Sequence, residues 1–151
     1  PYIISFLYLY NEHLLRDVIP EKDAQIIEKE EGKIIQFKDE KNEVRFSLSS
    51  EKIVYIESSD NYCVIKYINN ENLYEFMLRS TLKKLSEELA DTPIKRCHRS
   101  FMINFEHVAS LRKDGSEMCL EFDIKGIKEI PVSKTYNDKI MESFVTLSKQ
   151  K

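Results

Sequence analysis

Short runs in which apolar and polar residues alternate, or nearly alternate, fill the chain from Lys33 onward. Segments rich in Asn and Asp separate the first five runs, such as Asp39–Asn42 and Asn69–Asn72. A period of two is the pattern of a β-strand with one buried face, and Asn and Asp tolerate the left-handed backbone of tight turns. We therefore predict strands over residues 33–39, 43–49, 52–59, 62–68 and 73–79.

The alternation stops after residue 79, where leucines take over at a different spacing. Leu82, Leu85 and Leu89 lie at positions i, i+3 and i+7, which places them on one side of a helix. Ser80 or Thr81 can cap the N-terminus, and the Asp-Thr-Pro sequence that follows ends the pattern. The spacing predicts one helix within residues 80–91.

A second group of strand-like runs follows, and the chain then returns to helical spacing. Pro131 has no N–H to donate, so its strand is predicted to lie at the edge of a sheet. Ser133 is a candidate cap for a final helix. The apolar positions of that helix are Ile140, Phe144 and Leu147. We predict strands over residues 100–105, 107–112, 117–124 and 128–133.

The predicted fold is mainly β, with short antiparallel strands in small packed sheets, one mid-chain helix and one C-terminal helix. A chain of 151 residues is long enough for about one domain with its own core. We place that domain over residues 33–151. Residues 1–32 form a separate region with an apolar start and an acidic linker.

The opening ten residues, PYIISFLYLY, are almost wholly apolar, and the acidic residues 11–32 are interrupted by Pro20. Ten apolar residues are too few to span a bilayer, which takes about 20. The features of a signal peptide, a basic region and a small-residue cleavage site, are missing. Two interpretations stay open: an element packed on the domain, or the end of a transmembrane helix followed by a juxtamembrane linker.

Cysteine spacing and motif content argue against a disulfide framework, a metal site or catalysis. Cys63, Cys97 and Cys119 are odd in number and have no CxxC spacing, which fits reduced thiols in the cytoplasm. The chain contains no GxSxG, no HExxH and no glycine-rich phosphate loop, and it has only 3 glycines. We expect no enzymatic activity and no cofactor or metal ion.

The net charge of −3 is unevenly distributed. Residues 1–50 carry 7 Lys and Arg against 10 Asp and Glu, and residues 51–151 carry 16 of each. Between Lys95 and Arg112 there are four Lys and Arg and one carboxylate, Glu106. Electrostatic binding to DNA depends on the number of phosphate contacts, so this local basic edge is compatible with a nucleic-acid partner despite the negative total.

Four segments, in this order and at this spacing, resemble the LytTR (LytR/AlgR-type) DNA-binding domain of bacterial transcription regulators. They are IVYIESSDNYCVIKY, LRSTLKKLSEEL, RCHRSFMINFEHV and IPVSKTY. The resemblance covers about residues 50–147, and its most specific part is HRSFMIN between the leucine helix and PVSK. It implies a mostly β fold whose loops enter neighbouring major grooves on one face of double-stranded DNA, usually at direct repeats.

The resemblance also implies that the residues matching Asn61 (or Tyr62), Arg99 and Lys134 lie in three segments that face DNA. Lys134 departs from the family pattern, in which arginine is common, and this puts bidentate base reading at that position in doubt. From residue chemistry, the fork of Arg99 can pair with guanine O6 and N7. The predicted DNA-binding residues are Asn61, Tyr62, Lys95, Arg96, His98, Arg99, Ser100, Ser133 and Lys134.

Several of these residues have a purely structural alternative. His98 can serve its own backbone in a tight loop, Asn61 can simply form a hairpin turn, and Arg99 can be an ordinary surface arginine. Residues 95–100 are predicted to be an exposed loop, held by a strand whose alternating residues face a core. Those anchoring residues are Phe101, Ile103 and Phe105.

We predict sequence-specific binding of duplex DNA by the output domain of a bacterial, two-component-type transcription regulator. Self-association on DNA, and an upstream membrane segment or sensor kinase, are further expected partners. The location would be the cytoplasm, with anchoring to the inner membrane through a preceding region left open. The alternative is a β-rich protein-interaction or dimerisation module of a membrane-tethered sensor, whose basic loop binds an acidic partner.

Overall fold

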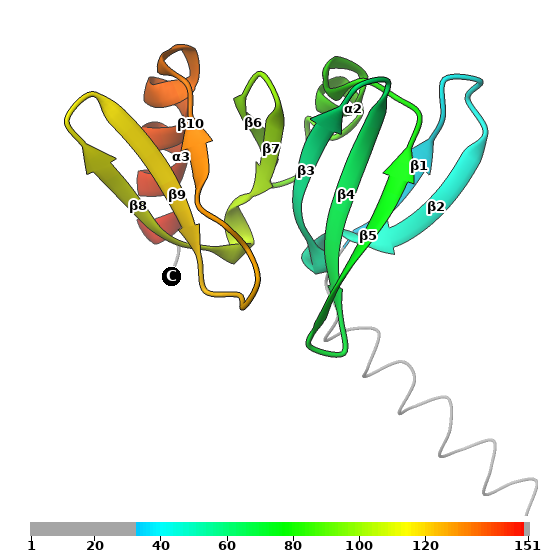
Figure 1. The fold of residues 1–151 in the computed structure, drawn as a ribbon, viewed down its shortest axis with the longest axis horizontal. Coiled ribbons are helices and arrows are strands. Elements are labelled where there is room, and N and C mark those ends of the chain that lie inside the picture. The colour runs from blue at the N-terminus through cyan, green and yellow to red at the C-terminus, as the bar shows by residue number, and fades with distance from the viewer. Residues whose placement is uncertain (1–32, 150–151) are drawn as a thin grey trace, which may run out of the picture. The chain divides into compact units, whose positions relative to one another are not determined.

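The computed structural model describes residues 33–149 (Figure 1). This part of the chain contains ten strands and two α-helices. The predictions for residues 1–32, an apolar start and an acidic linker, lie outside the described residues. No helix in the described part is long and apolar enough to cross a membrane.

The largest sheet has five strands in the order β5-β4-β3-β7-β6, and every neighbouring pair is antiparallel. Most of these pairs are hairpins, which follows from strand-forming runs joined by very short connections. The strands are β3 (Ile53–Ser59), β4 (Tyr62–Asn69), β5 (Asn72–Leu78), β6 (Ile94–His98) and β7 (Phe101–Asn104).

Two smaller antiparallel sheets and two helices complete the fold, as the sequence predicts. The two-stranded sheet consists of β1 (Ile34–Lys38) and β2 (Val44–Ser49). The three-stranded sheet, in the order β10-β9-β8, consists of β8 (Val108–Asp114), β9 (Glu117–Phe122) and β10 (Ile130–Val132). The helices are α2 (Leu82–Glu88) and α3 (Asn137–Lys149), and the 3₁₀ turns are η1 (Ser50–Lys52), η2 (Phe105–His107) and η3 (Lys134–Tyr136).

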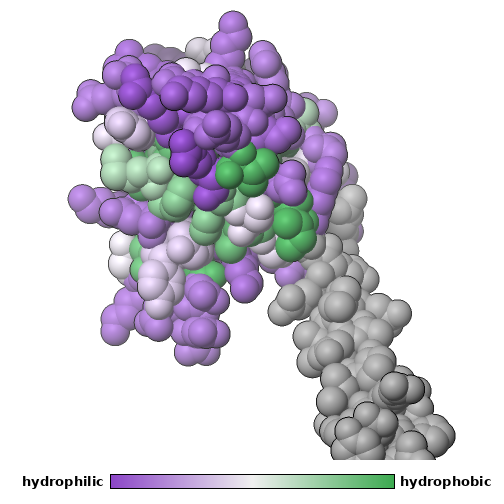
Figure 2. All heavy atoms as spheres, turned by 90° about the vertical axis from the view of Figure 1, so that its right-hand side faces the viewer, coloured by the Kyte–Doolittle hydropathy of each residue, from purple (hydrophilic) through white to green (hydrophobic). Residues whose placement is uncertain are grey.

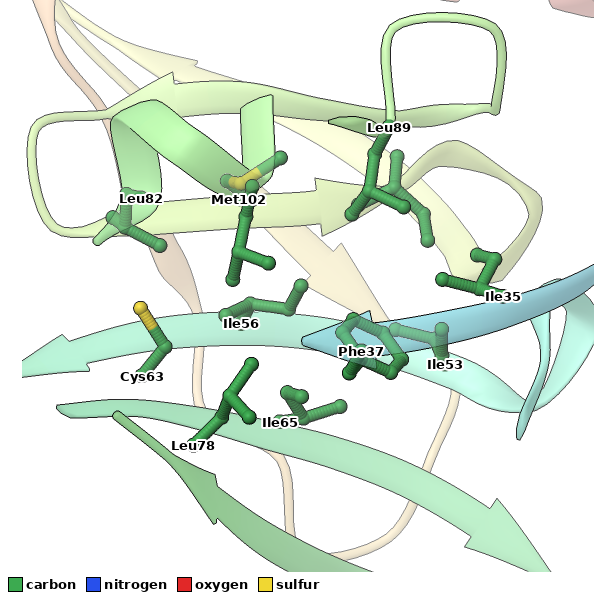
Figure 3. Packing of buried hydrophobic residues seen from close by; sticks show 12 residues of the cluster. Ile35, Phe37, Ile53, Ile56, Cys63, Ile65, Leu78, Leu82, Leu89 and Met102 are labelled. Carbon is green, nitrogen blue, oxygen red and sulfur yellow. The ribbon is translucent and has the colours of Figure 1, made fainter. Parts of the chain in front are cut away.

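Two hydrophobic cores lie on the two sides of β7. The first core joins the five-stranded sheet to β1 and α2, and Figure 3 shows its side chains converging between these elements. The second core joins β7 to the three-stranded sheet and α3. Met102 belongs to the first core and Ile103 to the second, and both are fully buried. A strand that is buried on both faces reads as a continuous apolar run, which explains the sequence FMI.

The mid-chain helix has the predicted cap and the predicted buried side. Thr81 is the N-cap, and its Oγ1 accepts a hydrogen bond from the Lys84 N–H at 3.2 Å. Leu82, Leu85 and Leu89 are all buried in the first core. The two predicted turns are also confirmed, because Asn42, Asn70 and Glu71 adopt positive φ angles of 66°, 51° and 68°. Residues 39–42 and 69–72 therefore reverse the chain without glycine.

The prediction of an exposed loop over residues 95–100 is wrong for most of that segment. Residues Ile94–His98 form β6, at one edge of the five-stranded sheet, and Cys97 is fully buried. The register with β7 shifts between Arg96 and His98. This irregularity puts buried residues at Ile94 and Cys97, three positions apart, so no period of two is visible in the sequence. The loop shrinks to Arg99 and Ser100.

Strand β10 lies at an edge of its sheet, as Pro131 predicts. The final helix differs in detail from the prediction. The chain forms η3 before α3, and the Ser133 side chain makes no capping hydrogen bond. Ile140 is nevertheless buried in the second core, Leu147 packs against it, and Phe144 is half-buried, which agrees with the predicted apolar side of the helix.

The side chain of Asn104 ties the end of β7 to the start of β3. It is fully buried, and its Nδ2 donates to the carbonyls of Ser50 at 2.9 Å and Ile53 at 2.7 Å. Its Oδ1 accepts from the N–H of Glu106 at 3.0 Å. Three backbone groups, two of them more than 50 residues before Asn104 in the sequence, thus depend on one amide for their hydrogen bonds.

We predict that Asn104→Ala lowers the free energy of unfolding by about 2–4 kcal/mol, because it leaves buried backbone groups without partners. Urea denaturation followed by circular dichroism measures this loss. Asn72→Ala is the matched control, since the exposed Nδ2 of Asn72 makes only a 3.4 Å bond to the Asn70 carbonyl. Equal losses for the two variants would contradict the bracing role of Asn104.

Candidate nucleic-acid interface

Three short connections that are far apart in the sequence lie at one end of the described unit (Figure 1). They are the β3–β4 turn at residues 60–61, the β6–β7 turn at residues 99–100, and the β10–η3 junction at residues 133–134. We call them the first, second and third reading segments. The Ser58 N–H donates to the Ser100 carbonyl at 2.9 Å, and the Ser133 N–H donates to the Cys97 carbonyl at 3.0 Å. The first bond ties the second segment to β3, which leads into the first segment, and the other ties the third segment to β6, which leads into the second.

The first reading segment is a tight hairpin turn. Asp60 adopts a positive φ of 54°, a conformation that Asp tolerates better than most residues. Ser59 pairs directly with Tyr62 across the turn, which leaves only Asp60 and Asn61 to form it. Both turn residues and Tyr62 are exposed. The hairpin role of Asn61 is thus present, and it leaves the amide side chain accessible.

The second reading segment is held by two residues of β6. Nη2 of Arg96 donates to the Arg99 carbonyl at 2.9 Å. Nδ1 of His98 accepts a hydrogen bond from the Ser100 N–H at 3.1 Å, and the imidazole packs on the Phe101 ring at a centroid distance of 5.7 Å. His98 therefore serves its own backbone, as its structural alternative states. With Nδ1 accepting, the neutral ring carries its proton on Nε2, which is left as a donor.

The side chain at the apex of this turn is unpaired. Arg99 is exposed, and among the described residues its guanidinium has no hydrogen-bond or ion-pair partner. In the third segment, Lys134 is likewise exposed and without a partner in residues 33–149, and Ser133 is half-buried. Two cationic side chains thus stand free next to a rigid backbone, ready to contact a negatively charged molecule.

The remaining basic residues of the predicted edge have other partners. Lys95 Nζ donates to the Ala90 carbonyl, and Arg96 reaches the Arg99 carbonyl from a half-buried position. Arg112 lies on β8 among carboxylates, which raise its pKa, Glu129 most strongly, followed by Asp114. Its ion pairs extend to Asp114, Glu121 and Glu129. Arg112 is therefore neutralised by its own sheet, so the cationic surface is smaller than the sequence indicates.

The cysteines are unsuited to nucleophilic or redox chemistry where they are buried. Burial raises the pKa of Cys97 to about 12 and that of Cys63 to about 11. The Cys97 Sγ lies 3.8 Å from the Phe101 carbonyl and 3.9 Å from the Pro131 carbonyl, within a packed interior. Within residues 33–149 no three His, Cys, Asp or Glu side chains are grouped so that they could hold a metal ion.

Comparison with known proteins agrees with this arrangement of turns on small sheets. The family model of the LytTr DNA-binding domain matches residues 43–144. The chain belongs to the LytTr DNA-binding domain family. The match spans β2 to α3, so this LytTr domain carries all three reading segments inside the family region, and β1 lies outside it.

A solved structure and a curated protein resemble this LytTr domain at low identity. The structure is the LytTr DNA-binding domain of a methyl-accepting/DNA response regulator from Bacillus cereus, with a TM-score of 0.56 and 20% identity. The aligned region covers 73% of this chain and 94% of the Bacillus cereus chain. This similarity supports the same fold. An uncharacterized response regulatory protein of Vibrio cholerae serotype O1 is 25% identical over 133 residues, which are 82% of this chain and 50% of that protein. The chain thus spans about half the length of the curated relative that it matches.

We predict that thiol alkylation of this folded LytTr domain near neutral pH modifies Cys119 well before Cys63 and Cys97. Cys119 is half-buried, whereas the other two thiols are fully buried, and burial disfavours their thiolates. Mass spectrometry of peptides after timed exposure to iodoacetamide measures each rate, and urea-unfolded protein supplies the intrinsic rates. Rapid labelling of Cys97 in the folded protein would contradict its inert environment.

Proposed function

We propose that the three reading segments enter the major groove of duplex DNA, with Arg99 reading a base and the flanking residues binding phosphates. The observation that carries the proposal is the unpaired Arg99 guanidinium at the apex of a turn whose backbone is held at both residues. A pre-ordered turn loses little conformational freedom on binding, so more of the interaction energy appears as affinity.

The chemistry of each segment suits a different part of the duplex. Arg99 can bond guanine O6 and N7 with two parallel N–H donors. Asn61 and Tyr62 can bond base edges or phosphates from the first segment, and Lys134 supplies a point charge for a phosphate in the third. Three further donors to phosphate oxygens are the hydroxyls of Ser100 and Ser133 and the Nε2–H of His98. Lys95 and Arg96 add positive charge behind the second segment.

We further propose that one domain binds a single site weakly and that direct repeats, with or without contact between copies, increase the affinity. Within the three reading segments only Arg99 and Lys134 are exposed cations without a partner among residues 33–149, so the electrostatic part of binding is small. Such a domain would act in the cytoplasm as the output of a transcription regulator, and a binding role needs no catalytic residue. The upstream input, whether a membrane segment or a sensor kinase, stays a prediction.

A protein-interaction module is the second candidate function, and one observation favours it. Figure 2 presents hydrophobic residues between hydrophilic ones on the face where β1, β2 and β5 lie. The large apolar side chains exposed on these strands are Ile34, Val44, Tyr74 and Met77. DNA binding should weaken steeply as the salt concentration rises, whereas an apolar protein contact should not. Selection of bound sequences from a random duplex pool, followed by salt titration, separates the two functions.

We predict that Arg99→Ala leaves the fold intact and weakens binding to the selected site by about 1–3 kcal/mol, with relaxed discrimination at one base pair. Arg99→Lys should restore affinity more than discrimination, because a lysine attracts phosphate but cannot form the bidentate pair. Fluorescence anisotropy on the selected site and on its single-base variants measures both quantities. An unchanged ratio of affinities for selected and scrambled DNA in Arg99→Ala would rule out base reading by this residue.

We predict that Lys134→Ala weakens binding about equally for all sequences and reduces the salt slope by about one unit, as expected for a lost phosphate contact. Titrations of selected and scrambled duplexes at several salt concentrations provide the slope. Lys125→Ala is a suitable control, since Lys125 is an exposed lysine outside the reading segments. A loss confined to one base position would assign base reading to Lys134 instead.

A further inference from the structure

A polar groove of about 580 Å³ lies beside the second and third reading segments. Strand β6, α2 and the η3–α3 region each contribute to its walls. Strand β6 is an edge strand, so no other strand of residues 33–149 pairs with its outer side. The lining residues are Ser86, Lys95, Arg96, Tyr136, Lys139, Ile140, Glu142 and Ser143.

The groove contains two cationic groups that have unused donors. Nε of Arg96 is buried and has no hydrogen-bond partner, although Nη2 of the same guanidinium is bonded to the Arg99 carbonyl. Lys139 is exposed, and the described residues offer its ammonium no partner. A buried N–H of a charged group without an acceptor is costly, and a negative charge bound in the groove would offset part of this cost through its attraction to the guanidinium.

Other residues of the groove shape the charge that it can accept. Ser86, Ser143 and Tyr136 carry hydroxyl groups that can donate to oxygen atoms. Glu142 also lines the groove and forms no ion pair within residues 33–149. One carboxylate opposite the Arg96 and Lys139 charges favours a single anionic group over a run of them.

The groove is continuous with the proposed base-reading surface through covalent and hydrogen-bonded links. Arg96 both lines the groove and holds the Arg99 carbonyl. Tyr136 lines it from η3, the turn that begins at Lys134. The groove lies to one side of Arg99 and Lys134, the side of α2 and α3. A DNA strand that contacts both residues would therefore pass the groove on only one of its two flanks.

We propose that this groove binds one backbone phosphate of the duplex beyond the base-reading turns, with the Arg96 guanidinium and Lys139 supplying its positive charge. The inference rests on the proposed DNA-binding function and extends it. It makes the footprint longer on one flank and independent of sequence on that flank, because a phosphodiester carries no base information. It also assigns DNA contacts to Lys139 and to the start of α3.

The test compares the selected minimal duplex with duplexes extended by about five base pairs, half a helical turn, on one flank or the other. Wild-type protein should bind one of the two extended duplexes more tightly than the minimal one. Lys139→Ala should abolish this gain, reduce the salt slope on that duplex by about one unit, and leave the minimal duplex within about twofold. Because the missing contact matters most at low salt, the deficit should shrink by about three- to fourfold between 50 and 200 mM salt.

Two further variants make the result specific to the groove. Lys149→Ala removes an exposed lysine of the same helix at its other end, and it should leave the gain unchanged. Glu142→Gln removes the opposing charge and should enlarge the gain. The NMR signal of the Arg96 Nε–H should shift on addition of the favoured extended duplex and stay in place with the minimal one.

Each contrary result has a distinct meaning. If Lys139→Ala weakens the minimal and extended duplexes equally, or has no effect on either, the groove is not a flank site, although the proposed function stands. If inorganic phosphate alone shifts the Arg96 Nε–H signal at constant ionic strength and the extended duplex does not, the groove serves a small anion and the inference is overturned. Absence of binding to every duplex would overturn the proposed function and the inference together.

Discussion

Strand β7 must be buried on both of its faces, and the remaining architecture depends on this constraint. Its four residues supply Met102 to the first core and Ile103 to the second, and Asn104 then bonds back to η1 and β3. Each core stabilises the position of the strand from its own side. The second reading segment directly precedes β7, so both cores together hold the turn that carries Arg99.

Most polar groups near the three reading segments form hydrogen bonds or ion pairs within the domain. Arg96, His98 and Ser58 bond to backbone atoms of the second segment, and Arg112 is paired with carboxylates of its own sheet. Within the reading segments, the cations that remain without a partner in residues 33–149 are Arg99 and Lys134. A domain without net positive charge can therefore present cations at one edge, where local potential and not the total determines attraction.

The sequence predicted the fold well where burial is one-sided and the turns are local. The hairpins at residues 39–42 and 69–72 and the leucine side of α2 are of this kind, because each depends on neighbours within a few positions. Strand β6 escaped prediction since a register shift between Arg96 and His98 removes the alternation. The pairing of Arg112 was not predictable either, because Glu121 and Glu129 approach it only after β8, β9 and the following segment have come together.

For the candidate site, local chemistry and family resemblance identified residues, whereas only the structure brought their segments together. Nothing in the spacing of Asn61, Arg99 and Lys134 indicates that Ser58 bonds to Ser100 in the turn and that Ser133 bonds to Cys97 in β6. The groove residue Lys139 was missed entirely, because its sequence context is that of an ordinary exposed helix. Only the structure shows that Lys139 lines the same groove as Arg96, whose Nε has no hydrogen-bond partner among the described residues.

The outer edge of β10 meets the end of β6, where the Pro131 carbonyl lies 3.9 Å from the Cys97 Sγ and the Ser133 N–H bonds the Cys97 carbonyl. Pro131 has no N–H to add to this junction, so hydrogen bonding between the two strands cannot extend along β10. A further backbone bond between the two strands would need a donor at that position. Backbone bonding between β10 and β6 is therefore limited to the end of β10. Among the described residues, the three-stranded sheet contributes only to the second core, whereas the five-stranded sheet contributes to both. Pro131 thus limits backbone hydrogen bonding between a sheet that lines both cores and a sheet that lines the second.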